Sequence, residues 1–233
     1  KDINLTVESG EVVVIIGPSG AGKSTFLRSL NNLEKITSGK IFIEDKLFYH
    51  RENDRTVDKM EAKQHKDLLL EMGMVFQHFN LFPDHSALEN VALPLTFQGV
   101  DKAKRLKKAS ALLDLVKLGK YKNHRPTQMS GGQQQRVGVA RALVVDPEII
   151  FADEPTGNLD SNTSREVMEL MQQVVHEKQQ TLVMVTHDNH LASFADRIFH
   201  IIDGKIVRID DMTGKSKEER EKEEKKREEE ASI

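Results

Sequence analysis

The sequence predicts an α/β protein whose central sheet is mainly parallel, and two patterns carry this prediction. The first is an apolar run at 12–16, typical of a buried strand, followed by a glycine-rich turn and a segment at 25–30 that suits a helix. The second places a strand at 149–152, a helix at 161–177 and another strand at 181–186. Strand, helix and strand in that order are the βαβ pattern of a parallel sheet.

Composition limits the classes of function. At 233 residues the chain is long enough to bury a substantial core, as one large or two small domains. A formal net charge of −3 gives no general attraction to nucleic acid, and we expect no nucleic-acid partner. The absence of cysteine excludes disulfides and thiolate metal sites. No apolar run approaches the roughly 20 residues that a membrane helix needs, and we expect no signal peptide.

The rest of the chain divides into shorter predicted elements. Alternating apolar and polar residues predict half-buried strands at 3–8 and 40–44, which suggest a small antiparallel sheet. The polar segment 45–70 is interpreted as a surface excursion with a short helix near 60–70. The other expected elements are a strand at 73–76, short helices around a loop between 83 and 98, helices at 101–118 and 133–144, and a hairpin of 199–202 with 205–209.

We group these elements into one domain at 1–214. Its nucleotide-binding core, with the β subdomain, is predicted at 1–76 and 134–209, and a helical subdomain at about 77–133 is inserted into it. The highly charged tail at 215–233 is interpreted as a solvated helix or a disordered extension.

The glycine-rich turn fits the template of a phosphate-binding loop. Its residues are Gly17, Pro18, Ser19, Gly20, Ala21, Gly22, Lys23 and Ser24. Glycines let the backbone turn with several N–H groups pointing inward, and the helix that follows presents its positive end to the same point. Lys23 is predicted to reach the β- and γ-phosphates of a nucleoside triphosphate, and the Ser24 hydroxyl to ligate Mg²⁺. The adjacent Thr25 completes the predicted nucleotide-binding segment.

A pair of carboxylates ends the strand predicted at 149–152. Asp153 is expected beside the metal, through a water molecule, and Glu154 is expected to accept a proton from the water that attacks the γ-phosphate. Because Pro155 follows, the pair is also compatible with a cap of the next helix. The phosphate loop upstream favours the catalytic interpretation.

A second candidate anion site consists of Ser130, Gly131, Gly132 and Gln133, at the start of a predicted helix. Small residues at a helix start offer backbone N–H groups and a hydroxyl to an anion. A Ser-Gly-Gly sequence taken alone is a common turn. In a chain that already has a phosphate loop, its predicted use is to cover the γ-phosphate bound to another subunit.

In combination, these motifs resemble the ATP-binding-cassette (ABC) ATPases, which are P-loop NTPases, from Asp2 to about Ile209. In that family the 130–133 segment is the signature turn. The resemblance implies that Gln77 touches Mg²⁺ and senses a transporter subunit, and that His187 contacts the γ-phosphate and holds the attacking water. It also implies that Asp160 joins the ATP site from a loop crossing a dimer seam. ATP and Mg²⁺ are the implied cofactors.

The same resemblance implies an assembly. Two subunits, expected to form a homodimer, would trap ATP between the phosphate loop of one and the signature turn of the other. The dimer would be a peripheral unit on the cytoplasmic face of the cell membrane, bound to transmembrane permease subunits, with a solute-binding protein as a further candidate partner. Permease helices would dock beside the Gln77 loop. The matching residues, which packing would explain as well, are Phe79, Leu81, Phe82, His85 and Glu89.

Different stretches point to different branches of the family. Residues 28–34 and 74–83 are similar to importers of polar amino acids such as glutamine, whereas 153–160 looks like the lipoprotein-release and macrolide-export branch. Uptake of polar amino acids is our main hypothesis, and the export or lipoprotein-release system is the alternative. A non-transport ABC ATPase is less favoured, and so is a regulatory subunit without turnover. The family's adenine-stacking aromatic residue is expected on a segment before Lys1, so no residue here is assigned that role.

Overall fold

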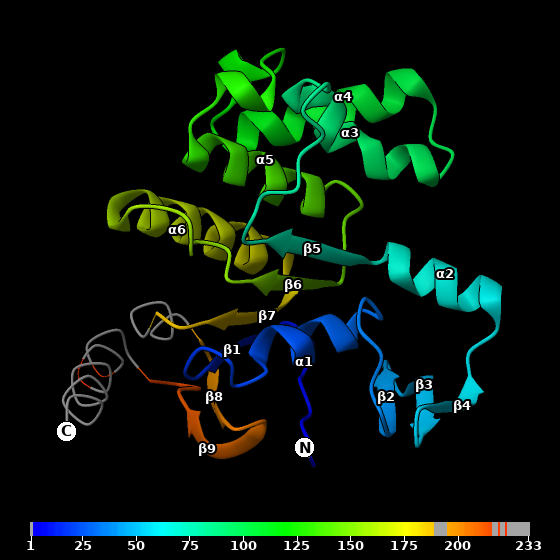
Figure 1. Ribbon diagram of the computed structural model, residues 1–233. Helices are drawn as coiled ribbons and strands as arrows, with labels where there is room; N and C mark the ends of the chain where they lie inside the picture. The colour runs from blue at the N-terminus through cyan, green and yellow to red at the C-terminus, as the bar shows by residue number, and fades with distance from the viewer. Residues whose placement is uncertain (1, 189–194, 216–218, 220–221, 223–233) are drawn as a thin grey trace.

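A computed structural model of the protein describes residues 2–188, 195–215, 219 and 222. A six-stranded sheet has helices on both faces, and a three-stranded sheet lies beside it (Figure 1). The strands are β1 Val12–Ile16, β2 Gly39–Ile43, β3 Lys46–Glu52, β4 Arg55–Lys59, β5 Met72–Phe76, β6 Ile149–Asp153, β7 Thr181–Thr186, β8 Arg197–Ile202 and β9 Lys205–Asp211. The helices are α1 Lys23–Leu30, α2 Ala62–Leu70, α3 Ala87–Phe97, α4 Lys102–Leu115, α5 Gly131–Leu143 and α6 Ser161–Lys178, with short 3₁₀ turns η1 Gly119–Tyr121 and η2 Pro126–Gln128.

The large sheet has the order β5-β6-β7-β1-β8-β9. Its strands pair in parallel except for the β8–β9 hairpin, so the predicted parallel sheet and closing hairpin are both confirmed. Alternate β1 side chains enter two cores: Val14 packs in the core that α5 and α6 share, and Val13 packs in the core that contains Leu27 of α1. Helices cover both faces of the sheet, so side chains on both sides of β1 and β7 are buried. This explains why the two strands are almost continuously apolar.

Three neighbouring parallel strands end at the same edge of this sheet. Asp153, the last residue of β6, is in register with Val185 of β7, and Thr186 of β7 is in register with Ile16 of β1. The segment 17–24 and residue 154, which are 130 to 137 positions apart in sequence, therefore begin side by side. Parallel α/β sheets place ligands outside these carboxyl ends.

Helices α3, α4 and α5 pack together beyond the β5 edge of the sheet (Figure 1). The α4 and α5 predictions are confirmed, whereas the expectation of short helices between 83 and 98 is wrong, because α3 runs unbroken through Pro94. Proline removes one backbone hydrogen bond from a helix. Val91 before Pro94 and Leu95 after it are both buried in the main core, and this packing holds α3 together across the proline. The proposed subdomain limits at about 77 and 133 remain a prediction.

The surface excursion predicted at 45–70 is wrong for its first half. Residues 46–59 form β3 and β4, which complete a three-stranded antiparallel sheet with β2, and only the helix near 60–70 agrees with α2. Phe48 and Tyr49 of β3 are buried against Leu68 of α2. The turn between β3 and β4 places Asn53 and Asp54 at φ 48° and 63°, which is the backbone that tight hairpins need.

The strand predicted at 3–8 is also wrong. Ile3, Leu5 and Val7 do alternate toward the core under α1, as the pattern required, but this segment pairs with no strand of the sheet. Both neighbours of β1 are already β7 and β8. The alternation of apolar and polar residues therefore indicated correctly that one side of this segment is buried, but it did not indicate whether the segment pairs with a strand.

Within the described ranges, no helix combines the length and the apolar character needed to cross a membrane. The prediction for the tail at 215–233 falls almost entirely outside those ranges.

Candidate functional site

The glycine-rich loop joins β1 to α1. Lys23, the first residue of α1, is buried, and its Nζ donates hydrogen bonds to the carbonyl oxygens of Gly17 at 2.9 Å and Pro18 at 3.1 Å. A Cβ at Gly17 would lie 2.0 Å from the carbonyl oxygen of Ile201, so only glycine fits where the loop passes β8. Of the other predicted residues, Ala21 is buried, Ser24 is half-buried, and the exposed ones are Pro18, Ser19, Gly20, Gly22 and Thr25.

Helix α1 begins without a capping side chain. Its N-cap is Gly22, which has no side chain to accept a hydrogen bond, and no acidic residue occupies its first turn. The first N–H groups of a helix have no partner within it, and they carry the positive end of the helix dipole. This start therefore fits an anion such as a phosphate.

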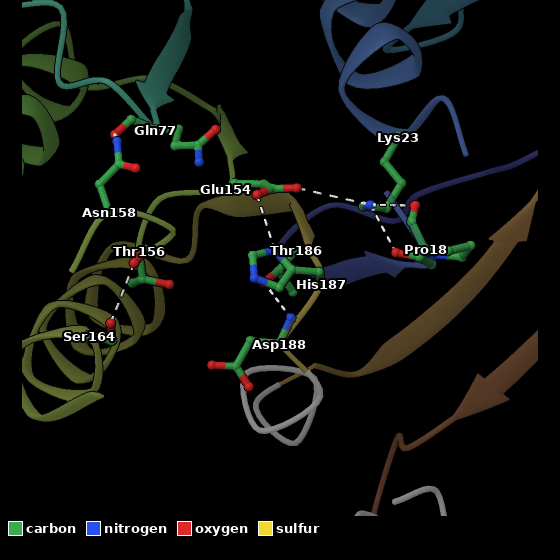
Figure 2. Close-up of polar contacts among 11 residues, drawn as sticks. Pro18, Lys23, Gln77, Glu154, Thr156, Asn158, Ser164, Thr186, His187 and Asp188 are labelled. Atoms are coloured by element: carbon green, nitrogen blue, oxygen red, sulfur yellow. Dashed lines mark hydrogen bonds and ion pairs between the residues drawn. The ribbon is translucent and has the colours of Figure 1, made fainter. Parts of the chain in front are cut away.

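Glu154 lies where the ends of β6, β7 and β1 meet. Its Oε1 is 3.9 Å from Lys23 Nζ and its Oε2 is 3.1 Å from His187 Nδ1, so a lysine and a histidine approach one carboxylate from two sides (Figure 2). The Glu154 backbone N–H donates to the carbonyl of Val185, which ties this corner to β7. The Glu154 side chain is 18% exposed and that of His187 is 61% exposed. The predicted base and histidine are thus brought together with the phosphate-loop lysine.

Asp153 is buried at the end of β6 and is paired with an arginine from α1. Its Oδ2 accepts from Nη2 of Arg28 at 2.7 Å and from Nε at 2.9 Å. The donor set expected for Mg²⁺ comprises the Ser24 hydroxyl, the Gln77 amide oxygen and the Asp153 carboxylate. These are hard oxygen ligands, and Mg²⁺ is commonly held by one or two carboxylates together with substrate phosphates. The chemistry of these residues therefore fits Mg²⁺, and among the described residues no cluster of three or more His, Cys, Asp or Glu forms an alternative metal site.

Gln77 follows β5, the strand next to β6. A Cβ at Gly157 would lie 2.8 Å from Gln77 Nε2 and 3.4 Å from Glu154 Oε2, so these two side chains flank the same glycine. Asn158 donates to the Gln77 carbonyl oxygen at 2.9 Å (Figure 2). The structure thus brings Gln77 to the edge of the Glu154 cluster.

The signature turn lies elsewhere in the subunit. Ser130 Oγ accepts from the Gln133 N–H at 3.3 Å, and Gln133 Oε1 accepts from the Ser130 N–H at 3.0 Å, which is a complete capping box at the start of α5. A Cβ at Gly132 would come within 2.3 Å of Thr163 Cγ2, so this glycine allows α5 to approach α6. In the described part of the chain, no hydrogen bond or ion pair joins the turn to the phosphate loop. Helix α5 packs beside β5, and two strands, β6 and β7, lie between β5 and β1.

Asp160 is the N-cap of α6. Its Oδ1 accepts from the Thr163 N–H and its Oδ2 from the Thr163 hydroxyl. These hydrogen bonds lower the pKa of the fully exposed Asp160 carboxyl. Because Thr163 also contacts the Gly132 position, the loop holding Asp160 and the signature turn are neighbours.

The residues expected at a docking surface separate into two groups. Phe82 is 49% exposed, whereas Leu81 packs against the main core. Phe79 is half-buried, with its ring 3.6 Å from where a Cβ at Gly131 would lie. Glu89 belongs to the capping box of α3 and half-buried His85 rests against the Phe82 ring. Packing thus accounts for Phe79 and Leu81, and Phe82 remains available to a partner.

Sequence reasoning assigned no role to three residues that contact this region. Arg28 pairs with Asp153, and Gln135 and Arg141 of α5 bond to backbone around Gln77. Burial lowers the pKa of the Arg141 guanidinium. The only sequence signal for them is that each lies on a helix starting at a glycine-rich motif, because their partners are 59 to 125 residues away.

The sequence profile described as ABC transporter matches residues 1–157 of the chain. The chain belongs to the ABC transporter family. It is an ABC ATPase, the ATP-hydrolysing part of a transporter. The roles of the signature turn and Asp160 in a shared ATP site remain predictions.

This ABC ATPase is similar in sequence to the following three proteins. It is 44% identical over 207 residues to the macrolide export ATP-binding/permease protein MacB of Aggregatibacter actinomycetemcomitans, covering 89% of this chain and 31% of MacB. It is 40% identical to the lipoprotein-releasing system ATP-binding protein LolD 1 of Chlorobium chlorochromatii, covering 88% and 80% of the two chains. It is 43% identical to the ABC transporter ATP-binding protein MJ0796 of Methanocaldococcus jannaschii, covering 92% and 89%.

A solved structure of MJ0796 supports the fold. It superposes with a TM-score of 0.79 at 41% identity, covering 92% of this chain and 90% of that one, and it is a dimer in a post-hydrolysis state bound to ADP and Pi. This ABC ATPase spans less than a third of MacB, so MacB's whole activity does not transfer to it directly. Of these relatives, MacB is a macrolide export protein and LolD 1 belongs to a lipoprotein-releasing system, and neither supports the predicted amino-acid importer branch.

Proposed function

We propose that this ABC ATPase binds Mg·ATP at 17–25 and hydrolyses it with Glu154 as general base. The observation that carries the proposal is the cluster of Lys23, Glu154 and His187, formed where three parallel strands end. Hydrolysis of a terminal phosphate uses a lysine on the phosphates and a residue that orients or deprotonates the attacking water, and this cluster holds a candidate for each, with Lys23 Nζ 3.9 Å from Glu154 Oε1.

Each residue of the cluster has a distinct role in this proposal. Lys23 leaves the carbonyls of its own loop to contact the β- and γ-phosphates of the substrate. Glu154 accepts the proton of the attacking water, and His187, bonded to Glu154 Oε2, holds that water in line. Mg²⁺, held by Ser24, Gln77 and Asp153, would neutralise charge on the phosphate oxygens.

We further propose that two copies complete the site, with Ser130, Gly131, Gly132, Gln133 and Asp160 supplied by the opposite subunit. Support comes from the separation of the signature turn from the phosphate loop within one subunit, and from the dimeric MJ0796 structure. The capping box satisfies Ser130 within its own helix, so the turn is preformed before a second subunit arrives.

For the transport reaction, we propose an exporter or lipoprotein-release type of system. The 40–44% identity to MacB and LolD 1 supports this alternative over amino-acid uptake, and a solute-binding protein has no support.

The ATPase would bind permease subunits as a peripheral protein on the cytoplasmic face of the membrane, with Phe82 as a contact residue. A photo-crosslinking amino acid placed at position 82 should form a covalent link to that permease in the cells that produce the ATPase. Mass spectrometry of the crosslinked product would then identify the permease.

Replacing the general base tests the ATPase proposal. Glu154→Gln is expected to lower kcat by about 10²–10⁴-fold while retaining ATP binding, because the amide cannot accept the proton. The variant should accumulate as an ATP-bound dimer, measured by light scattering. Glu169→Gln, at an exposed glutamate of α6, is the matched control and should behave as the parent. An unchanged kcat in Glu154→Gln would refute the assignment.

A further inference from the structure

The loop that follows β5 is held through its backbone carbonyl groups. All five carbonyl oxygens from Phe76 to Asn80 accept a hydrogen bond. The acceptors and donors are Phe76 with Gln135 Nε2 at 3.2 Å, Gln77 with Asn158 Nδ2 at 2.9 Å, His78 with the Asn80 N–H, Phe79 with Arg141 Nη2 at 2.9 Å and Asn80 with Arg141 Nη1 at 2.6 Å. Four of these five bonds come from side chains outside the loop.

Two of the external side chains belong to the signature helix α5. Gln135 is completely buried and also donates to the carbonyl of Pro155, so it joins the loop to the turn just after Glu154. Arg141 lies nearly two turns further along α5 and uses two nitrogens of its guanidinium for adjacent carbonyls. A planar guanidinium suits such a paired contact, which a lysine ammonium cannot reproduce.

The part of the loop that Arg141 contacts has an uncommon backbone. Phe79 and Asn80 have φ values of 50° and 51°, in the left-handed region that non-glycine residues seldom adopt. Two consecutive residues of this kind persist only when their surroundings hold them. Arg141 bonds to both, and it does so from a half-buried position on another element.

This backbone places the Phe79 ring behind the signature turn. A Cβ at Gly131 would lie 3.6 Å from Phe79 Cζ and 3.4 Å from Leu159 Cδ2. The second signature glycine similarly faces Thr163, whose N–H and hydroxyl bond to Asp160. The Gln77 loop, the signature turn and the Asp160 loop of one subunit therefore form one packed unit.

We propose that Arg141 is a positioning residue: by fixing the backbone of 79 and 80, it makes the Gln77 loop and the signature turn move together. The inference rests on the proposed function, because it concerns how a signal at the Gln77 loop reaches the turn that covers the partner's ATP. ATP binding at the subunit's own phosphate loop does not depend on this contact.

The test uses the full-length chain carrying Glu154→Gln, in which dimerisation by ATP is measured without turnover. Adding Arg141→Met, which preserves bulk but removes both hydrogen bonds, is expected to weaken ATP-driven dimerisation at least about tenfold. The affinity of the monomer for a fluorescent ATP analogue should stay within about twofold. Hydrogen exchange should rise at 77–82 and at 129–133 and stay unchanged in β1 and β7. Arg141→Lys should recover part of the dimerisation, because its single ammonium nitrogen can donate to one of the two carbonyls but lacks the paired geometry of the guanidinium.

Arg105→Met is the matched control, since Arg105 also donates to a backbone carbonyl, that of Val100, but away from the loop. It should dimerise as the Glu154→Gln parent does. If the parent itself forms no ATP-bound dimer, the proposed function fails. If the parent dimerises and Arg141→Met dimerises equally well, or if exchange rises throughout the chain instead of in the two segments, the positioning role is overturned.

Discussion

Helices α1 and α5 both start at glycine-rich turns, but only one of them supplies its own cap. Helix α1 follows Gly22 and has neither a capping side chain nor an acidic residue in its first turn. Helix α5 follows Ser130, whose hydroxyl and N–H are both satisfied by Gln133. The first start depends on an external anion to satisfy its N–H groups, whereas the second is stable before any ligand arrives.

This difference matches the proposed division of labour. In the proposal the phosphate loop binds ATP by itself, and its buried lysine lies 3.9 Å from Glu154, the proposed general base. In the proposal the signature turn contacts ATP that is already bound to the phosphate loop of the opposite subunit. A turn that is capped within its own helix suits this role, because it does not need the ATP in order to form. Substitutions at the two helix starts and at their neighbours test that contrast.

Lys23→Ala should have the largest effect on nucleotide binding. Removing a buried cation that pairs with phosphates costs about 2–5 kcal/mol, or about 30- to 5000-fold in Kd. Isothermal titration with ATP measures this loss, and Lys40→Ala, at an exposed lysine of β2, is the control. Affinity within threefold of the parent would show that α1 does not depend on phosphate in the way proposed.

Gly132→Ala should destabilise the fold at the α5–α6 contact. The added methyl would overlap Thr163 Cγ2 at 2.3 Å, and overpacking of this kind costs about 1–3 kcal/mol of unfolding free energy. Thr163→Ser removes that methyl group and leaves Cβ and Oγ1 at 3.7 and 3.9 Å, so the double variant should recover most of the loss. Urea denaturation of the four proteins measures the coupling, and simple additivity would contradict the contact.

Ser130→Ala should lower stability by about 1 kcal/mol, because it removes a capping side chain that α5 has and α1 lacks. ATP binding to the monomer should be unaffected. Ser130→Arg should add a block to ATP-driven dimerisation, detected by light scattering in the Glu154→Gln background. Normal dimers from Ser130→Arg would argue against a shared site.

The smallest expected effect distinguishes the capping boxes of α3 and α5 by pH. Hydrogen bonds from the Ser86 N–H and hydroxyl lower the pKa of Glu89 below its ordinary value of 4.5. A lowered folded-state pKa means that the cap stabilises the protein above pH 4.5 and loses this contribution as pH falls through the folded value. Glu89 is exposed, so screening keeps the effect under about 1 kcal/mol.

Glu89→Gln should remove this acid sensitivity from α3, since an amide, like that of Gln133 in α5, does not titrate. The difference in unfolding free energy between parent and variant should therefore change between pH 6 and pH 3. Denaturant titrations across that interval provide the measurement. A difference that is constant with pH would contradict the role of the Glu89 carboxylate in the cap.

The sequence predicted those features of the fold and the candidate site that a short run of neighbouring residues encodes. The phosphate loop is a run of eight residues between an apolar strand and a helix, and the Asp153–Glu154 pair ends another strand. Parallel strand order then forces both to the same edge. The β3–β4 hairpin was missed because the burial of Phe48 depends on α2, where His65 stacks on its ring at 4.7 Å. No pattern within β3 itself reports that partner.

The sequence by itself determined the α/β class, the parallel sheet and the phosphate loop with its lysine, because short-range periodicity and backbone geometry specify these. Tertiary structure alone decided that Arg28 pairs with Asp153, and that Arg141 holds the backbone of Phe79 and Asn80. Those contacts join residues 61 to 125 positions apart. Their geometry exists only after the sheet and the helices have packed, which no local pattern in the chain records.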